Sequence, residues 1–159
     1  MPTPTNPANV SSVDSSLSDM EDPNIVILQL LKNDWGADAR QNFKYQKQKV
    51  RFFGQDQFYD GGATPCIVVW WMGDDVGRWG GGSAKRYHHS DHRIWIFCRD
   101  PDERWQVVKE VERILQKYAI NPSPNMLRVD YYKIIPWQQP SPVQKLFRAT
   151  VDCRVIFVK

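Results

Sequence analysis

Hydrophobic and polar side chains alternate most regularly over residues 147–158. The odd-numbered positions of this run are Phe147, Ala149, Val151, Cys153, Val155 and Phe157. The even-numbered positions from 148 to 154 carry Arg, Thr, Asp and Arg. Because a period of two is typical of a β-strand that buries one face, we predict a strand whose odd-numbered side chains enter the core.

Four further runs predict strands. Residues 66–72 are continuously apolar, as in a compact buried strand, and residues 92–99 and 127–135 are rich in apolar and β-branched residues. Residues 43–53 alternate, so that Val50 and Phe52 share one face and four polar residues share the other, namely Tyr45, Lys47, Lys49 and Arg51. The glycine-rich residues 73–90 are expected to form a long loop.

The clearest helix spans residues 101–118. Asp100 is suited to cap its N-terminus, Pro101 to take the first helical position, and Glu103 to complete a capping box. An apolar stripe wide enough to lie flat on a sheet recurs at helical spacing. Its members are Trp105, Val107, Val108, Val111, Ile114, Leu115 and Tyr118.

A second, shorter helix is predicted at the start of the folded part of the chain. Asp22 and Pro23 form a helix start, the apolar run 25–31 follows, and residues 33–36 end it. The resulting order, α-β-β-β-α-β-β, predicts an α+β fold in which two helices pack on an antiparallel or mixed sheet of about five strands. Residues 22–159 would then form one domain.

Composition narrows the class of protein. Residues 1–21 are rich in Pro, Ser, Thr and Asn and are expected to be a flexible arm. The net charge of +3 is smaller than that of a dedicated nucleic-acid-binding domain. With no apolar run of membrane-spanning length and no signal-peptide pattern, we expect a soluble protein made in the cytoplasm.

The three cysteines each fall in a predicted strand. Cys66, Cys98 and Cys153 are too few and too scattered for a disulfide framework. We expect them to be reduced and to fill the core as small apolar residues.

The three histidines, His88, His89 and His92, lie within five residues and are the candidates for a metal site. Zinc sites draw ligands from two or more elements, and no second cluster of ligands stands out in the sequence. We therefore favour a polar loop that leads into a strand. A small metal-dependent hydrolase centred on these histidines is the second alternative function.

The glycine-rich stretch 77–86 lacks the Gly-Lys-Ser/Thr ending of a phosphate-binding loop, and a strand follows it where such a loop requires a helix. No Ser or Cys has a recognisable nucleophile setting such as Gly-x-Ser-x-Gly. We accordingly expect no catalytic residues and no cofactor, and a protein that acts by binding or assembly. The first alternative is a nucleic-acid-binding module that uses basic residues and nearby aromatic rings, with Lys47, Lys49, Arg51, Lys85 and Arg86.

The order and character of these elements resemble those of the tail-terminator proteins, also called tail-completion or neck proteins, of tailed bacteriophages and related viruses. The run 25–31 is similar to the early helix of that family, and residues 101–118 are similar to its long helix. The central strands correspond to residues 66–72 and 92–99, and the closing strands to 127–135 and 147–158.

The resemblance implies a structural virion protein that is not an enzyme. Such a protein forms a homo-oligomeric ring, usually a hexamer, at the head-proximal end of the tail tube. Its partners would be copies of itself, the tail tube protein and the head-tail connector proteins, with transient contact to DNA and none to a membrane. It would be found in the virion, in the tail or neck, and in the host cytoplasm during assembly. Candidate interface residues, taken from predicted loops, are Arg78, Trp79, Lys85, Arg86 and Trp137.

Overall fold

The computed structural model describes residues 22–37, 50–54, 65–78, 86–123, 126–137 and 147–158. They form two helices and six strands: α1 (Pro23–Asp34), β1 (Arg51–Gly54), β2 (Cys66–Arg78), β3 (Arg86–Cys98), α2 (Pro101–Lys117), β4 (Ile120–Ser123), β5 (Met126–Trp137) and β6 (Phe147–Val158). The α+β class is therefore confirmed. The expected N-terminal arm and most of the expected strand 43–53 lie outside the described residues.

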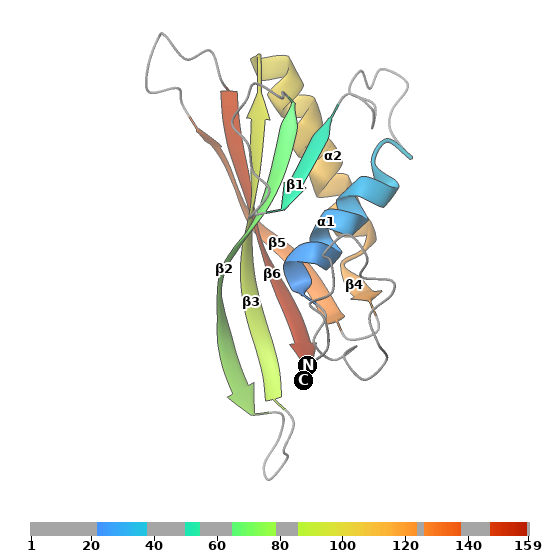
Figure 1. Cartoon of the computed structure of the whole chain (residues 1–159), viewed down its shortest axis with the longest axis vertical. Coiled ribbons are helices and arrows are strands. Elements are labelled where there is room, and N and C mark those ends of the chain that lie inside the picture. Colours follow the sequence, from blue (N-terminus) through green and yellow to red (C-terminus); the bar gives the residue numbers. More distant parts are fainter. Residues whose placement is uncertain are drawn as a thin grey trace, which may run out of the picture.

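The six strands form one curled, mixed sheet in the order β1-β2-β3-β6-β5-β4. The short strand β1 pairs in parallel with the start of β2, and every other neighbouring pair is antiparallel. Both helices lie on the same side of the sheet (Figure 1). The sheet therefore has one face covered by helices and one face that no described helix covers.

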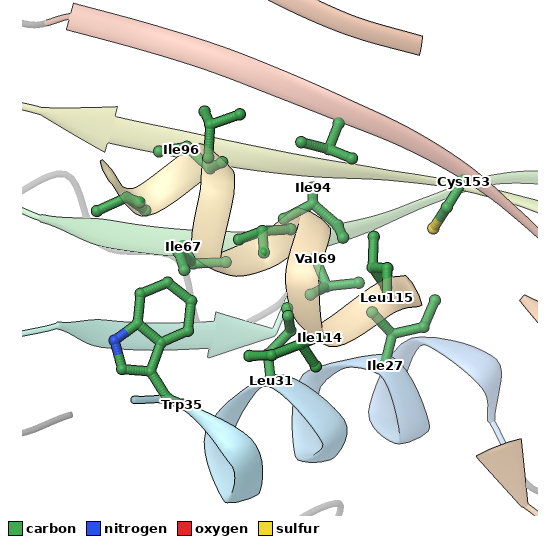
Figure 2. Close-up of a cluster of buried hydrophobic side chains, with 14 of the residues drawn as sticks. Ile27, Leu31, Trp35, Ile67, Val69, Ile94, Ile96, Ile114, Leu115 and Cys153 are labelled. Carbon is green, nitrogen blue, oxygen red and sulfur yellow. The ribbon is translucent and has the colours of Figure 1, made fainter. Parts of the chain in front are cut away.

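The core fills the space between the helices and the covered face of the sheet. Ile27 and Leu31 of α1 and Ile114 of α2 point toward Val69 and Ile94 of the sheet (Figure 2). These side chains are fully buried, so each contributes about 1.5–3 kcal/mol from loss of apolar surface to water. The alternation expected for the last strand is confirmed, because the odd-numbered side chains of β6 join this cluster.

The predicted helix starts are also confirmed. The Asp22 carboxylate accepts a hydrogen bond from Asn24 N at 2.9 Å, and the Asp100 carboxylate accepts one from Glu103 N at 2.8 Å. Glu103 in turn accepts from Arg99 N at 2.5 Å, the residue before the cap, so the reciprocal bond is made one residue earlier than in a standard capping box. Local polar side chains therefore fix where each helix begins.

A network of charged side chains ties the end of α1 to α2. Asp34 accepts hydrogen bonds from Arg113 Nη1 at 3.1 Å and from Lys117 Nζ at 3.0 Å. Arg113 also pairs with Glu110, which accepts a hydrogen bond from Gly36 N at 2.9 Å. The two helices are thus joined by directional bonds as well as by the apolar contact.

The expectation of a long loop after residue 72 was wrong. Residues 73–78 and 86–90, expected as part of a loop, continue β2 and β3 into a long hairpin. Backbone pairing with β3 holds this half of β2 in the sheet although its sequence contains Gly73 and Gly77. Gly73 has φ of 132°, next to a bulge between Trp71 and Gly73, a conformation that favours glycine. A sixth strand, β4, was not expected.

Two expectations about tryptophans were also wrong. Trp105, expected in the buried stripe of α2, is 63% exposed, and Lys109 Nζ lies 4.6 Å from its ring centroid. The stripe that packs on the sheet begins at Val107 and Val108. Trp137, expected in a loop, is the last residue of β5, opposite Arg148 of β6. Among the described residues, no helix is long and apolar enough to cross a membrane.

Candidate functional site

The large hydrophobic residues exposed to solvent are concentrated on the two edges of the sheet. Four lie on β2, four lie on β4 and β5, and Trp105 lies on α2. None of those found among the described residues lies on the central strands β3 and β6. The eight edge residues are Trp70, Trp71, Met72, Val76, Ile120, Leu127, Tyr132 and Trp137. Exposed apolar residues scattered singly are normal, but two such groups on opposite edges mark candidate contact surfaces.

The first group, which we call the β2 edge, occupies residues 70–78. This half of the β2–β3 hairpin extends past α1 (Figure 1). Met72 and Val76 are more than half exposed, at 52% and 57%. Trp71 Nε1 donates a hydrogen bond to Asp74 at 2.8 Å, which holds the indole along the strand. The run expected as a compact buried strand is therefore buried only as far as Val69 and becomes exposed at Trp70.

The second group, which we call the β5 edge, lies on the opposite side of the sheet. Ile120 belongs to the short strand β4, and the other three belong to β5. Leu127 and Tyr132 sit at the two irregularities in the pairing of β5 with β6. Bulged residues leave the regular alternation of a strand, which helps to explain why these side chains remain in solvent.

The face of the sheet away from the helices carries stacked aromatic rings. The ring of Trp95 stacks on Trp137 with centroids 5.9 Å apart and on Phe97 with centroids 6.1 Å apart. Trp137 Nε1 donates a hydrogen bond to Thr150 Oγ1 at 2.9 Å, which fixes the indole across β6. The Arg93 guanidinium lies 5.7 Å from the Trp95 centroid. These contacts bury Thr150, although it is on the face that no described helix covers.

Charged residues on this face are paired across the strands. Arg93 binds Asp152 through two hydrogen bonds of 2.8 and 3.0 Å, and Arg154 binds Asp91 through two of 2.8 and 3.1 Å. In each pair the positive charge is compensated by a carboxylate of the neighbouring strand. These two arginines are therefore poorly placed to supply the unpaired positive charge that a phosphate-binding surface uses.

The three candidate metal ligands do not converge. All three histidines lie on β3, not in a loop, because the hairpin continues to Arg86. His88 and His92 share one face of the strand and His89 points to the other, as the period of two requires. The described residues contain no group of three or more His, Cys, Asp or Glu side chains placed to hold a metal ion.

His92 instead belongs to a buried hydrogen-bonded chain. Its Nε2 lies 2.7 Å from Ser90 Oγ, and its Nδ1 lies 2.6 Å from Asn24 Oδ1 of α1. The Asn24 amide nitrogen donates to Val69 O at 3.4 Å, which leaves Oδ1 to accept from His92 Nδ1–H. The imidazole is then neutral, with Nε2 accepting from the Ser90 hydroxyl.

This order of hydroxyl, imidazole and amide has the parts of a nucleophilic relay, but its burial argues for a structural role. Ser90 and His92 are each only 1% exposed, so a substrate atom has no approach to the hydroxyl in this conformation. Burial lowers the pKa of His92 to about 4, against the opposing charges of Asp74 and Asp91. The chain of bonds holds the start of α1 on the sheet.

The other predicted site residues are placed as follows. Arg78 and Arg86 are opposite each other at the last pair of the hairpin, and Trp137 is exposed at the end of β5. Arg51 is exposed on β1. Trp79, Lys85, Lys47 and Lys49 lie outside the described residues.

The sequence-based prediction missed the β2 edge. A signal was present, because the apolar run 66–72 contains two Trp and a Met at its end and is followed by Asp74 and Asp75. Large aromatic residues only three positions before acidic ones, with a glycine between them, are a poor fit to a strand that is buried to its end. Comparison of the chain with models of known protein families and with curated proteins finds no match.

Proposed function

We propose that this chain is a structural subunit that assembles with copies of itself into a ring. In its finer form, the proposal is a tail terminator, a ring at the head-proximal end of a viral tail tube that joins the tube to the head connector. One observation carries the proposal: exposed large hydrophobic residues lie on two opposite edges of the sheet.

Two different contact surfaces on one subunit are what a ring requires. A heterologous contact joins one surface of a subunit to a different surface of the next, and it closes into a ring if the rotation between subunits allows it. The β2 edge and the β5 edge are different in sequence and lie on opposite sides of the sheet. Aromatic residues, which both edges carry, and Met, which the β2 edge carries, are enriched at the centre of protein interfaces.

The order of elements supports the finer form of the proposal. An early helix, three strands, one long helix and closing strands recur in the tail terminators that the sequence resembles. The structure adds β4 after the long helix and lengthens the hairpin β2–β3. A projecting hairpin suits a ring subunit, because it gives each copy a surface beyond its own core that can reach a neighbour.

The test is the mass of the purified chain and of edge variants. Sedimentation or light scattering should give a whole multiple of 18.6 kDa for the wild type, and negative-stain images should show closed rings. Val76→Lys on the β2 edge and Tyr132→Ser on the β5 edge should each weaken assembly by about tenfold or more. Trp105→Lys, which changes an exposed aromatic residue on α2, is the control and should leave the ring intact.

A mixture of the two edge variants distinguishes a heterologous contact from a symmetric one. Each variant keeps one intact edge, so the mixture should form a dimer that cannot grow. A wild-type chain that stays monomeric at high concentration contradicts the proposal. The finer form is tested by adding the ring to polymerising tail tube protein, which should yield capped tubes of limited length. Tubes that grow unchanged would contradict the tail-terminator role.

A further inference from the structure

Backbone groups on both edges of the sheet lie outside the pairing of the described strands. The outer side of β2 pairs with β1 only from Cys66 to Val69, and no described strand pairs with it over residues 72–78. β5 pairs with β4 at Met126 and Arg128, and Val129 N donates to Ala119 O. Beyond that point no described strand pairs with the outer side of residues 130–135. An open edge of this kind is a template for a further strand.

The two open segments are at opposite ends of the sheet as well as on opposite sides. Residues 72–78 of β2 are at the end of the sheet where the hairpin β2–β3 turns. Residues 130–135 of β5 are nearer the other end, because Trp137 is in the same row as Phe97 and Cys66. β1 pairs with the first residues of β2, and β4 pairs with the first residues of β5. These two covered segments are at opposite ends of the sheet. The open segment of each edge is therefore at the end of the sheet where the other edge is covered.

The strand directions allow the two open segments to pair. β2, β3, β6 and β5 are successively antiparallel, so β5 runs opposite to β2. When two copies stand side by side in the same orientation, β5 of one copy is antiparallel to β2 of the next. The offset between the open segments displaces the copies along the strands. A displacement of this kind is the stagger that closes tilted strands into a barrel or ring.

Side chains on the two segments are complementary in charge and size. Asp75 is in the row of His89 and Ile156, and Lys133 is opposite Asp152, which places both on the face away from the helices. Both are exposed. An antiparallel register that sets Asp75 opposite Lys133 also sets Gly73 opposite Ile135. Pro136, which has no N–H to donate, then follows the paired segment.

We propose that neighbouring copies of this chain join by antiparallel pairing of residues 72–78 of β2 with residues 130–135 of β5, with Asp75 opposite Lys133. This inference rests on the proposed function, because it names the contact that would build the ring. The occupant of each open edge is thus a second copy of the chain. The pairing would join the sheets of neighbouring copies and cover the open segments of β2 and β5, which reduces the aggregation hazard of an exposed apolar strand.

Charge reversal tests the register. Asp75→Lys alone and Lys133→Asp alone each place like charges opposite each other and should weaken assembly by about threefold to tenfold. The double variant exchanges the charges and should recover most of the wild-type affinity. Both side chains are exposed, so the single variants are expected to fold, and circular dichroism checks this. Single variants that assemble as the wild type does would overturn the register.

Disulfide cross-linking tests the pairing itself. The double variant Asp75→Cys with Lys133→Cys should oxidise to a ladder that ends at the size of the ring. The two single variants, mixed, should give cross-linked dimers only. The double variant Asp75→Cys with Ile135→Cys tests a register displaced by two residues, in which position 75 would be opposite position 135. Asp75→Cys with Lys109→Cys is the control, because Lys109 is exposed on α2, and it should form no ladder.

The outcomes separate this inference from the proposed function. A ring in which neither β5 position cross-links to position 75 overturns the strand pairing and leaves the ring standing. Cross-linked dimers from Asp75→Cys alone would indicate a symmetric β2–β2 contact and overturn the pairing as well. A chain that is monomeric before oxidation overturns both.

Discussion

Asn24 and His92 are 68 residues apart in the sequence, yet Asn24 Oδ1 and His92 Nδ1 are 2.6 Å apart in the folded chain. The contact joins the first turn of α1 to the middle of β3. It fixes the tautomer of His92, orients the imidazole toward Ser90 and buries it without charge. The neutral state of His92 is therefore a requirement of the fold.

This requirement predicts a pH dependence of stability. The pKa of His92 is lowered by burial from 6.5 to about 4, so between these values the unfolded chain binds the proton and the folded chain does not. The contribution of neutral His92 to the free energy of unfolding is fully present above pH 6.5 and is lost as the pH falls toward 4. The loss should reach about 3 kcal/mol, from the difference between the two pKa values. Urea unfolding at a series of pH values measures it.

His92→Gln should remove this dependence on pH. The amide can still bond to Asn24 but does not titrate, so stability should change less between pH 6.5 and 4 than in the wild type. His89→Gln, on the other face of the same strand, controls for the substitution. If the stability of His92→Gln changes with pH as steeply as that of the wild type, the assignment of this pH dependence to His92 is contradicted.

Removing the charge of Asp34 should destabilise the contact between the two helices. Burial acts to raise the pKa of Asp34, but hydrogen bonds and charge from Lys117 and Arg113 outweigh it and hold the pKa below its ordinary value. Asp34→Asn should cost about 2–3 kcal/mol, because it removes the negative charge that Arg113 and Lys117 bind. Thermal unfolding provides the measurement. Asp130→Asn, which removes the partner of the exposed Arg128, is the control and should cost less than about 1 kcal/mol.

The two faces of α2 should respond differently to truncation. Ile114 is fully buried against the sheet, so Ile114→Ala should cost about 2–5 kcal/mol through lost burial and the cavity left behind. Trp105→Ala removes a larger side chain but an exposed one, and should change stability by less than about 1 kcal/mol. Denaturant unfolding of both variants checks the ranking. The reverse order would place Trp105 in the core after all.

The cysteines should be unreactive in the folded chain. All three are buried and free, and burial raises the pKa of Cys66 to about 11 and those of Cys98 and Cys153 further. Because the thiolate is the reactive species, a thiol reagent at neutral pH should label none of them in native protein and all three in denaturant. Rapid labelling of native protein would contradict this placement. Because the native cysteines are unreactive, disulfide cross-links in the variants described above can be assigned to the introduced cysteines.

Sequence patterns predicted the elements whose local signals agree with their burial. The cap of Asp100, the proline after it and the stripe from Val107 to Leu115 all favour one helix in one orientation. Strand β6 alternates over its whole length, so its pattern selects both the strand and its buried face. The capping of α1 by Asp22 was predicted on the same grounds.

Predictions failed where contacts with another element, and not the local composition, determine the structure of a segment. Residues 73–78 contain two glycines and two aspartates and have the composition of a loop, but pairing with β3 keeps them extended. Trp105 is three residues before the buried Val108 and so matches the helical period of the stripe, but its side chain is 63% exposed. Periodicity gives a face to within a residue or so and does not state where the contact with the sheet ends.

The amino-acid sequence alone determined the α+β class, both helix starts and the buried face of β6, because these depend on spacing and on bonds between residues close in the chain. Only the tertiary structure decided the length of the hairpin β2–β3, the separation of the histidines onto two faces and the two edges that carry exposed aromatic residues. Those features depend on which strands pair and over what length. That pairing is set by contacts between segments far apart in the sequence, which no local pattern records.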